Sequence, residues 1–362
     1  MVLAYYVIIC ILSFLCCVIF FWRVRSNFSP LYSLIFILAL LAHLSYVMLA
    51  LSENVREALL ANKMLYIGGC YLQMIGMFLI ITICNIRPLK WIRFLMVLFS
   101  TAVYGCVLTA GYLPIFYKSV EIEKRNGITV LIKEYGPAHM LFYAEIILYL
   151  LITIGVLIYG WMKRPDVSRR NLLIASIMQI TSIFAFFVGR SITKNIEWMA
   201  LADLVDEIGF LLIMDRVVLY RVDDLVSSSI LKDGQFGYLS LDLNHKYLGA
   251  TEAARRFLPE IVKNHTDREI ENSELRDLFG KWIEEYEEKK VSTVHTYRRK
   301  GCIYLIRISS LYDGKRKRGY LLEISDDTAH QQHLEGIERY NKNLNEELMA
   351  KTKLIRELRN KK

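Results

Sequence analysis

Carboxylates inside long apolar stretches are the residues of this sequence best placed to do chemistry. Glu145 lies in the apolar stretch 139–162, and Asp203 and Glu207 lie in the stretch 197–216. Asp203 and Glu207 are four residues apart, so they share one face of a helix. Ionisable groups are costly inside a membrane and therefore mark ligand sites, ion paths or contacts between helices.

Other polar residues fall at similar depths in neighbouring apolar stretches. The further candidates for a polar pocket are His43, Tyr71, Gln73, Arg190 and Trp198. Such a pocket would suit a small ligand that is partly cationic or that forms hydrogen bonds. Alternatively, these groups pair with one another between helices and only stabilise the bundle.

The elements that position these residues follow from the distribution of charge. Of the 362 residues, 54% are hydrophobic and 22% are charged, and the mean hydropathy is +0.31. Only 30 charged residues lie in residues 1–216, whereas 51 lie in the shorter segment 217–362. This division excludes a single soluble globule, a secreted disulfide scaffold and a disordered chain. It predicts an α-helical membrane bundle followed by a soluble region.

Seven apolar runs are each near the roughly 20 residues that a helix needs to cross a bilayer. They are residues 2–22, 31–51, 64–84, 92–112, 139–162, 171–189 and 197–216. The first run lacks the basic flank and cleavage site of a signal peptide. Basic residues are packed most densely after the first, third and fifth runs, which favours an N-terminus outside and a C-terminal region in the cytoplasm.

A β-hairpin is predicted at about 117–135, between the fourth and fifth spans. Two segments of alternating apolar residues, 117–125 and 128–135, flank Asn126-Gly127, which is a strong signal for a two-residue turn. The hairpin could be a lid over a ligand site or a plain connector, and the sequence leaves both alternatives open.

Several other functions are disfavoured by composition. The net charge of +9 is shared by both regions, so anionic membrane lipids explain it better than nucleic acid does. Six of the seven cysteines lie in apolar runs and none forms a Cys-x-x-Cys pair, so we expect no disulfide framework and no metal site.

A receptor is favoured over an intramembrane enzyme and over a transporter. Catalytic groups facing one another from two spans are missing, so we expect no catalytic residues and no enzymatic activity in this chain. A small-solute transporter with a cytoplasmic regulatory domain is the alternative. Transporters typically show internal repeats or broken helices, and no proline lies in the middle of any predicted span.

The soluble region reads as three parts. Residues 217–233 continue the last span as a connecting helix, and residues 234–328 alternate as two strands, helices and three strands, which is a small α+β module. Residues 329–362 form a helix with a heptad seam in which Asn341 takes position a, where a buried Asn fixes the register of parallel dimers. A homodimeric coiled coil is therefore predicted, with a solvated amphipathic helix as the alternative.

The α+β module resembles a PAS domain. Asp326-Asp327-Thr328 closes the last predicted strand immediately before the long helix, as the Asp-x-Thr-like signal of PAS domains does before their output helix. Ala250-Thr251 stands where an Asn is common in that family. Cys302 lies on a predicted strand rather than in a flavin-attachment motif. His265 and His295 could be proposed as haem ligands, but a lone exposed histidine far more often has no such role, so we expect a module without a cofactor.

Taken together, the seven spans, the hairpin and the PAS-like module resemble the seven-helix sensor region at the N-terminus of bacterial histidine kinases and related signalling proteins. The resemblance implies a receptor of the bacterial inner membrane that binds an unknown small extracytoplasmic or membrane-embedded ligand. It also implies an output such as a kinase, a cyclic-dinucleotide synthase or a phosphodiesterase. The chain contains no motif of these outputs, and His330 and His333 lack the context of a phosphoacceptor. We therefore expect the output on a separate partner or on a longer protein of which this chain is part.

Overall fold

The structure is a computed structural model that describes residues 2–23, 30–86, 88–164, 167–192, 196–220, 236–313 and 316–360. It divides into two compact units, Met1–Val217 and Val218–Lys362. The connecting helix predicted at 217–233 falls mostly outside the described residues, since α8 ends at Tyr220 and the next described residue is Phe236.

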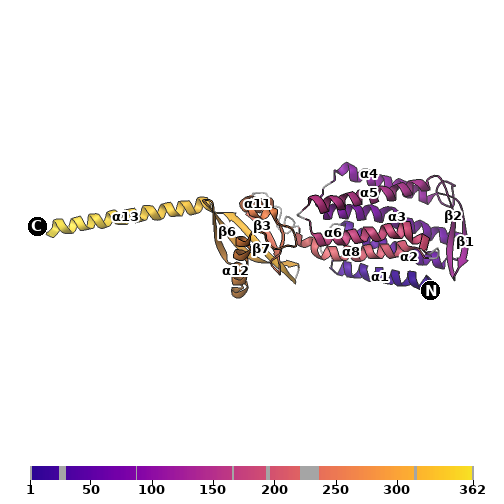
Figure 1. The fold of residues 1–362 in the computed structure, drawn as a ribbon, viewed down its shortest axis with the longest axis horizontal. Coiled ribbons are helices and arrows are strands. Elements are labelled where there is room, and N and C mark those ends of the chain that lie inside the picture. Colours follow the sequence, from indigo (N-terminus) through magenta and orange to yellow (C-terminus); the bar gives the residue numbers. More distant parts are fainter. Residues whose placement is uncertain are drawn as a thin grey trace. The chain divides into compact units, whose positions relative to one another are not determined.

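Long apolar helices build the first unit and run side by side in Figure 1. Their bounds are α1 (Val2–Arg23), α2 (Pro30–Leu51), α3 (Val55–Ile83), α4 (Lys90–Leu108), α5 (His139–Lys163), α6 (Arg169–Ile183) with the π-helix η1 (Phe184–Gly189), α7 (Arg190–Ile192) and α8 (Trp198–Tyr220). Side-chain caps fix two of the starts, because Asn54 accepts a hydrogen bond from the Glu57 amide and Ser168 accepts one from the Asn171 amide. The Asn54 cap explains why α3 begins nine residues before the predicted span.

Helix α3 lies in the middle of the bundle and is the most buried of the candidate spans. Ala61, Cys70 and Leu79 on it are fully buried. At Gly68, a Cβ atom would lie 2.8 Å from the Cβ of Ala42 on α2. Small residues at this crossing therefore allow α2 and α3 to approach closely, as is typical of helices that pack in a membrane.

Six of these helices are long and apolar enough to span a membrane among the residues that the structure describes. They are the helices within Val2–Arg23, Ser33–Leu51, Val55–Ile83, Lys90–Leu108, His139–Lys163 and Arg169–Gly189. The seventh predicted span corresponds to α8, which has 23 residues but carries Asp203, Asp206 and Glu207 in its first half. Those three carboxylates lower the mean hydropathy of α8.

The hairpin lies at the end of the bundle where the N-terminus of α1 also lies (Figure 1). Strands β1 (Tyr117–Arg125) and β2 (Ile128–Tyr135) pair in antiparallel register, with Arg125 opposite Ile128. Asn126 and Gly127 have φ angles of 52° and 77°, which a two-residue hairpin turn of this type requires. The Thr129 hydroxyl donates to the Ser52 carbonyl at 2.5 Å, so the hairpin is docked on the loop after α2.

The second unit is a five-stranded antiparallel sheet with helices and a long final helix. Its elements are β3 (Phe236–Asp242), β4 (Tyr247–Ala250), α11 (Glu252–Phe257), the 3-10 helix η2 (Pro259–Lys263), α12 (Ser273–Lys289), β5 (Val294–Arg299), β6 (Cys302–Asp313), β7 (Arg316–Asp326) and α13 (Thr328–Asn360). The strand order is β4-β3-β7-β6-β5. Alternate residues of the sheet, such as Ile306 with Ile308 and Leu322 with Ile324, form the core together with Phe279 of α12.

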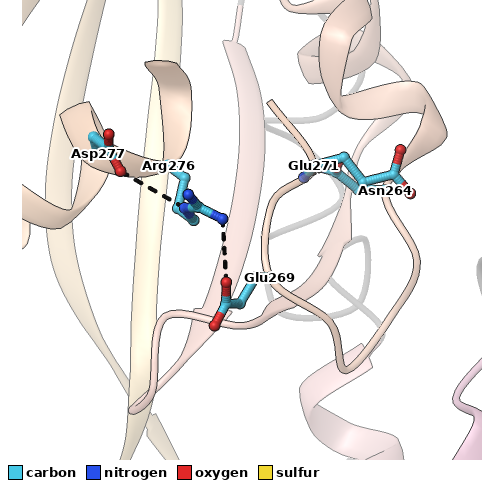
Figure 2. A network of polar contacts seen from close by, with 5 residues as sticks. All are labelled: Asn264, Glu269, Glu271, Arg276 and Asp277. Carbon is cyan, nitrogen blue, oxygen red and sulfur yellow. Dashed lines mark hydrogen bonds and ion pairs between the residues drawn. The ribbon is translucent and has the colours of Figure 1, made fainter. Parts of the chain in front are cut away.

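A polar loop leads into α12 and is fixed by local contacts (Figure 2). The side-chain oxygen of Asn264 accepts a hydrogen bond from the Glu271 amide at 3.0 Å. Arg276 on α12 forms an ion pair of 3.2 Å with Glu269 and one of 3.6 Å with Asp277. These ion pairs are exposed and contribute little to stability, so the Asn264 contact and the buried Ile270 position the loop.

Asp326, Asp327 and Thr328 join the sheet directly to α13. The Asp326 carboxylate accepts hydrogen bonds from the Thr328 amide at 3.0 Å and from its hydroxyl at 2.5 Å. The Ile303 amide donates to the Thr328 hydroxyl oxygen at 2.9 Å, and the Asp327 amide donates to the Ile303 carbonyl at 2.9 Å. The first residues of α13 are therefore held against β6.

Candidate functional site

A cavity of about 150 Å³ lies inside the helical bundle. We call it the larger cavity to distinguish it from an adjoining cavity of about 20 Å³. Helices α2, α3, α5 and α6, the π-helix η1, the start of α8 and strand β2 all contribute to its wall. A cavity of about 150 Å³ accommodates a benzene-sized molecule. Ligand sites combine apolar walls with a few placed polar groups.

The polar groups of the larger cavity come from several elements. Gln73 of α3 and Asp203 of α8 are the two predicted pocket residues that line it, and Gln179 and Ser182 of α6 lie beside them. Asp203 is buried, with 7% of its surface exposed. The aromatic part of the wall consists of Tyr46, Tyr66, Phe142, Phe186 and Phe187. Carboxylate and aromatic faces together suit a small organic cation or a hydrogen-bonding molecule.

The hairpin supplies Lys133, which also lines the larger cavity. Its ammonium group donates to the side-chain oxygen of Asn62 at 2.7 Å and lies 5.9 Å and 5.5 Å from the ring centres of Tyr66 and Tyr117. The Tyr117 hydroxyl donates to the Tyr66 hydroxyl at 3.0 Å, and the Asn62 amide donates to Tyr117 at 3.2 Å. Strand β2 is therefore part of the cavity wall, tied to α3 by charge and hydrogen bonds.

Neither Lys133 nor Tyr66 could be assigned to the pocket by sequence reasoning. The one signal in the sequence is that Lys133 falls in the phase opposite to the apolar Val130 and Ile132, and a lysine there also suits an exposed edge residue. The docking of the hairpin on α3 decides between these roles, and a strand pattern does not contain that information.

A smaller cavity of about 20 Å³ adjoins this region and is lined by the acidic face of α8. Leu72, Gln73, Gln179, Ser182 and Asp203 line both cavities. Asp206 and Glu207 line only the smaller one. Thus the shared helix face that the four-residue spacing of Asp203 and Glu207 predicts is the face turned to the smaller cavity.

Glu145 lies away from both cavities. On α5 it is buried and accepts a hydrogen bond of 2.5 Å from the Ser100 hydroxyl of α4. The same Ser100 oxygen lies 2.8 Å from the Tyr149 hydroxyl, whose proton is directed to the Met96 carbonyl at 3.1 Å. This cluster joins α4 to α5.

The remaining predicted pocket residues also contact neighbouring helices. His43 of α2 is buried, with its Nε2 2.9 Å from the Ala200 carbonyl of α8. Tyr71 of α3 donates to the Thr101 hydroxyl of α4 at 3.2 Å. Trp198 packs edge-on to Phe184, with ring centres 6.0 Å apart, and covers Gly189 so closely that a Cβ there would lie 2.6 Å from it. Arg190 begins the short helix α7, and its side chain lies outside the described part.

The π-helix η1 contributes Ala185, Phe186 and Phe187 to the larger cavity. Single π-turns within α-helices are rare and occur often at functional sites. Here the extra residue per turn brings the aromatic side chains of η1 to the cavity, where α6 ends. Within the described residues, no group of three or more His, Cys, Asp or Glu side chains is arranged to hold a metal ion.

The apolar helices and their internal polar cavity define a multi-pass membrane protein. Residues 5–213 match the family described as the N-terminal 7TM region of histidine kinase, and the chain belongs to this family. The match covers α1 to the middle of α8 and both cavities. The comparison with curated proteins gives no significant match.

Proposed function

We propose that the protein is a membrane receptor that binds a small ligand in the larger cavity and passes the signal to an output outside this chain. The observation that carries the proposal is the cavity itself, in which Asp203 and Gln73 meet aromatic side chains beneath the hairpin. Membership of a histidine-kinase sensor family supports a role in membrane signalling. The chemistry of the wall favours a small amine or another hydrogen-bonding molecule.

In this proposal the hairpin is a lid. Lys133 lines the larger cavity and is held there by Asn62, Tyr66 and Tyr117, so a ligand near Asp203 changes the electrostatic surroundings of the lid. A ligand shifts the bundle only by binding one arrangement better than another. Contacts that differ between an open and a closed hairpin would provide that difference.

The proposed relay uses the second unit as a PAS-like domain without a cofactor. The order of two strands, helices and three strands supports this assignment, as does the Asp326–Thr328 link to α13. We propose that α13 pairs with its copy in a second chain as a parallel coiled coil. Its seam residues Leu334, Ile337, Leu344 and Leu348 are 39–54% exposed in the single chain, so they are available for pairing.

The proposed topology has seven spans, with α8 as the seventh, the hairpin outside a bacterial plasma membrane and the second unit in the cytoplasm. The acidic face of α8 turned to the cavities supports its membrane placement, because ionisable groups in spanning helices face the bundle interior. We assign no catalysis to the chain itself. Autophosphorylation of the purified chain by ATP would contradict that assignment.

The test is a thermal-shift screen of the full chain in detergent with small amines, choline and the amino acids. At least one of these probes should raise the melting temperature, because a ligand that binds only the folded state stabilises it. Asp203→Asn should remove the shift, and Glu145→Gln, which changes a buried carboxylate away from the cavity, should keep it. Transport of a stabilising probe into liposomes that contain the protein would instead identify a transporter, and a screen without any shift would contradict the ligand site.

A further inference from the structure

The smaller cavity has the size and lining of a site for a single small ion. Its volume is about 20 Å³, and one water molecule needs about 10–15 Å³ measured in this way. The oxygen-bearing side chains of its wall are Gln73, Thr153, Gln179, Ser182, Asp203, Asp206 and Glu207. Oxygen ligands such as these are preferred by hard cations.

Glu207 is the residue of this wall that most needs a positive partner. Its side chain is fully buried, at 0% exposure. Oxygen Oε1 accepts a hydrogen bond of 2.9 Å from the Ser13 hydroxyl on α1, whereas Oε2 has no hydrogen-bond partner among the described residues. A buried carboxylate oxygen without a partner is costly, so a bound cation at Oε2 would lower the free energy of the folded state.

Among the described residues, the wall of the smaller cavity does not supply that positive charge. No lysine, arginine or histidine is among the described residues that line the smaller cavity. The titratable groups within electrostatic range of Glu207 are Asp203 and Asp206 on α8 and Cys10, Cys16 and Cys17 on α1. All of these groups are neutral or negative. Asp206 adds a second free oxygen, since its Oδ1 also has no partner among the described residues, while Oδ2 is 3.4 Å from the Ser182 hydroxyl.

We propose that the smaller cavity binds one small monovalent cation, with Glu207 Oε2 as the charged ligand and the oxygens of Asp206 and Ser182 beside it. The cation is Na⁺ or a proton, since both bring one positive charge to a carboxylate oxygen. A divalent metal fits less well, because no group of three or more acidic, His or Cys side chains among the described residues converges on one point. The cation links α8 to α6.

The cation site goes beyond the proposed ligand site, although the two share Asp203, Gln73, Gln179 and Ser182. Glu207 lines only the smaller cavity, so its substitution separates the two proposals. A chain that responds to Na⁺ but to none of the organic probes would keep the cation site and reject the ligand site. A chain that responds to an organic probe, but through Glu207 to neither Na⁺ nor protons, would keep the ligand site and reject the cation site.

The experiment measures the melting temperature of the full chain, purified in sodium-free buffer, while NaCl replaces N-methyl-D-glucamine chloride at constant ionic strength. The melting temperature of the wild-type protein should rise with NaCl concentration until the site is saturated, and Glu207→Gln should abolish this rise. Asp206→Asn should weaken the apparent Na⁺ affinity by about tenfold, which is one lost charged contact of roughly 1.4 kcal/mol. The matched control Glu145→Gln should respond as the wild type does.

A titration of pH in sodium-free buffer distinguishes the two cations. If the wild type shows no response to NaCl but is stabilised as pH falls from 9 to 6, and Glu207→Gln removes that stabilisation, then the cation is a proton. If neither NaCl nor pH acts through Glu207, the proposal is overturned. Should Glu207→Gln fail to fold, Asp206→Asn with an unchanged response to both cations would overturn it equally.

Discussion

The hydroxyl of Ser13 on α1 donates a hydrogen bond of 2.9 Å to Oε1 of Glu207 on α8. This contact joins residues 194 positions apart, and both side chains are fully buried. The contact therefore joins α1 and α8, the first and last helices of the bundle, at Glu207, which is one of the residues that line the smaller cavity. Because water is excluded from both partners, this contact contributes more to stability than a surface hydrogen bond would.

Ser13→Ala should destabilise the protein. It leaves Glu207 Oε1 without its donor, and an unsatisfied buried polar group costs about 1–3 kcal/mol. The expected result is a lower melting temperature in detergent. Ser45→Ala is the matched control, because the Ser45 hydroxyl is also buried but bonds only to the Leu41 carbonyl of its own helix at 2.6 Å. An equal fall in melting temperature in the two variants would argue against a special role for the α1–α8 contact.

Substitution of Glu145 should affect stability rather than ligand binding. Glu145→Ala removes the acceptor of the Ser100 hydroxyl between α4 and α5, so we expect the free energy of unfolding to fall by about 1–3 kcal/mol. The melting temperature should fall, while the shift produced by a stabilising amine should stay as in the wild type. A lost shift with an unchanged melting temperature would return Glu145 to the ligand site.

Part of this arrangement is readable from the sequence, and part depends on tertiary packing. Asn126-Gly127 between alternating strands predicts the hairpin, whose strands lie at 117–125 and 128–135. The spacing of Asp203 and Glu207 predicts their common face, because helix periodicity relates residues of one helix. The same periodicity cannot say which neighbour a face meets. The sequence therefore groups Glu145 with Asp203, although Glu145 contacts Ser100 of α4.

Lys133→Ala should loosen the hairpin. The substitution removes the bond to Asn62 and the positive charge over the rings of Tyr66 and Tyr117. Amide hydrogen exchange of residues 117–135 should become faster, since local opening then requires less free energy. In the control Lys118→Ala, exchange should stay close to the wild type because Lys118 forms only an exposed ion pair of 3.3 Å with Glu134. Unchanged exchange in Lys133→Ala would show that Lys133 does not hold the hairpin.

His295 in the second unit should titrate below its ordinary value of 6.5. Burial lowers the pKa of His295, although Glu285 at 4.0 Å opposes the shift, and the imidazole is stacked on Trp282 with ring centres 4.6 Å apart. Since the folded pKa is below the unfolded one, the unfolded chain binds more protons between the two values. The stability due to His295 is therefore complete above pH 6.5 and is lost as pH falls through the folded pKa.

NMR titration of ¹³C-labelled histidine in the full chain measures this pKa directly. Trp282→Ala exposes the imidazole, so the pKa of His295 should rise toward 6.5. A pKa of His295 at or above 6.5 in the wild type would contradict the burial argument.

Asn341→Leu should strengthen self-association of α13. Asn341 takes position a between Leu334 and Leu348, and a polar residue there fixes the pairing of two strands at a cost in stability. In a peptide of residues 329–362, Leu at this position should tighten association by about tenfold or more and relax the preference for two strands.

Asn343→Leu is the matched control, because Asn343 is two residues away, off the seam, and exposed. Analytical ultracentrifugation of the three peptides distinguishes the outcomes. If the wild type stays monomeric at high concentration and Asn341→Leu gains nothing over Asn343→Leu, the apolar face of α13 is a solvated helix face and any dimer is held elsewhere.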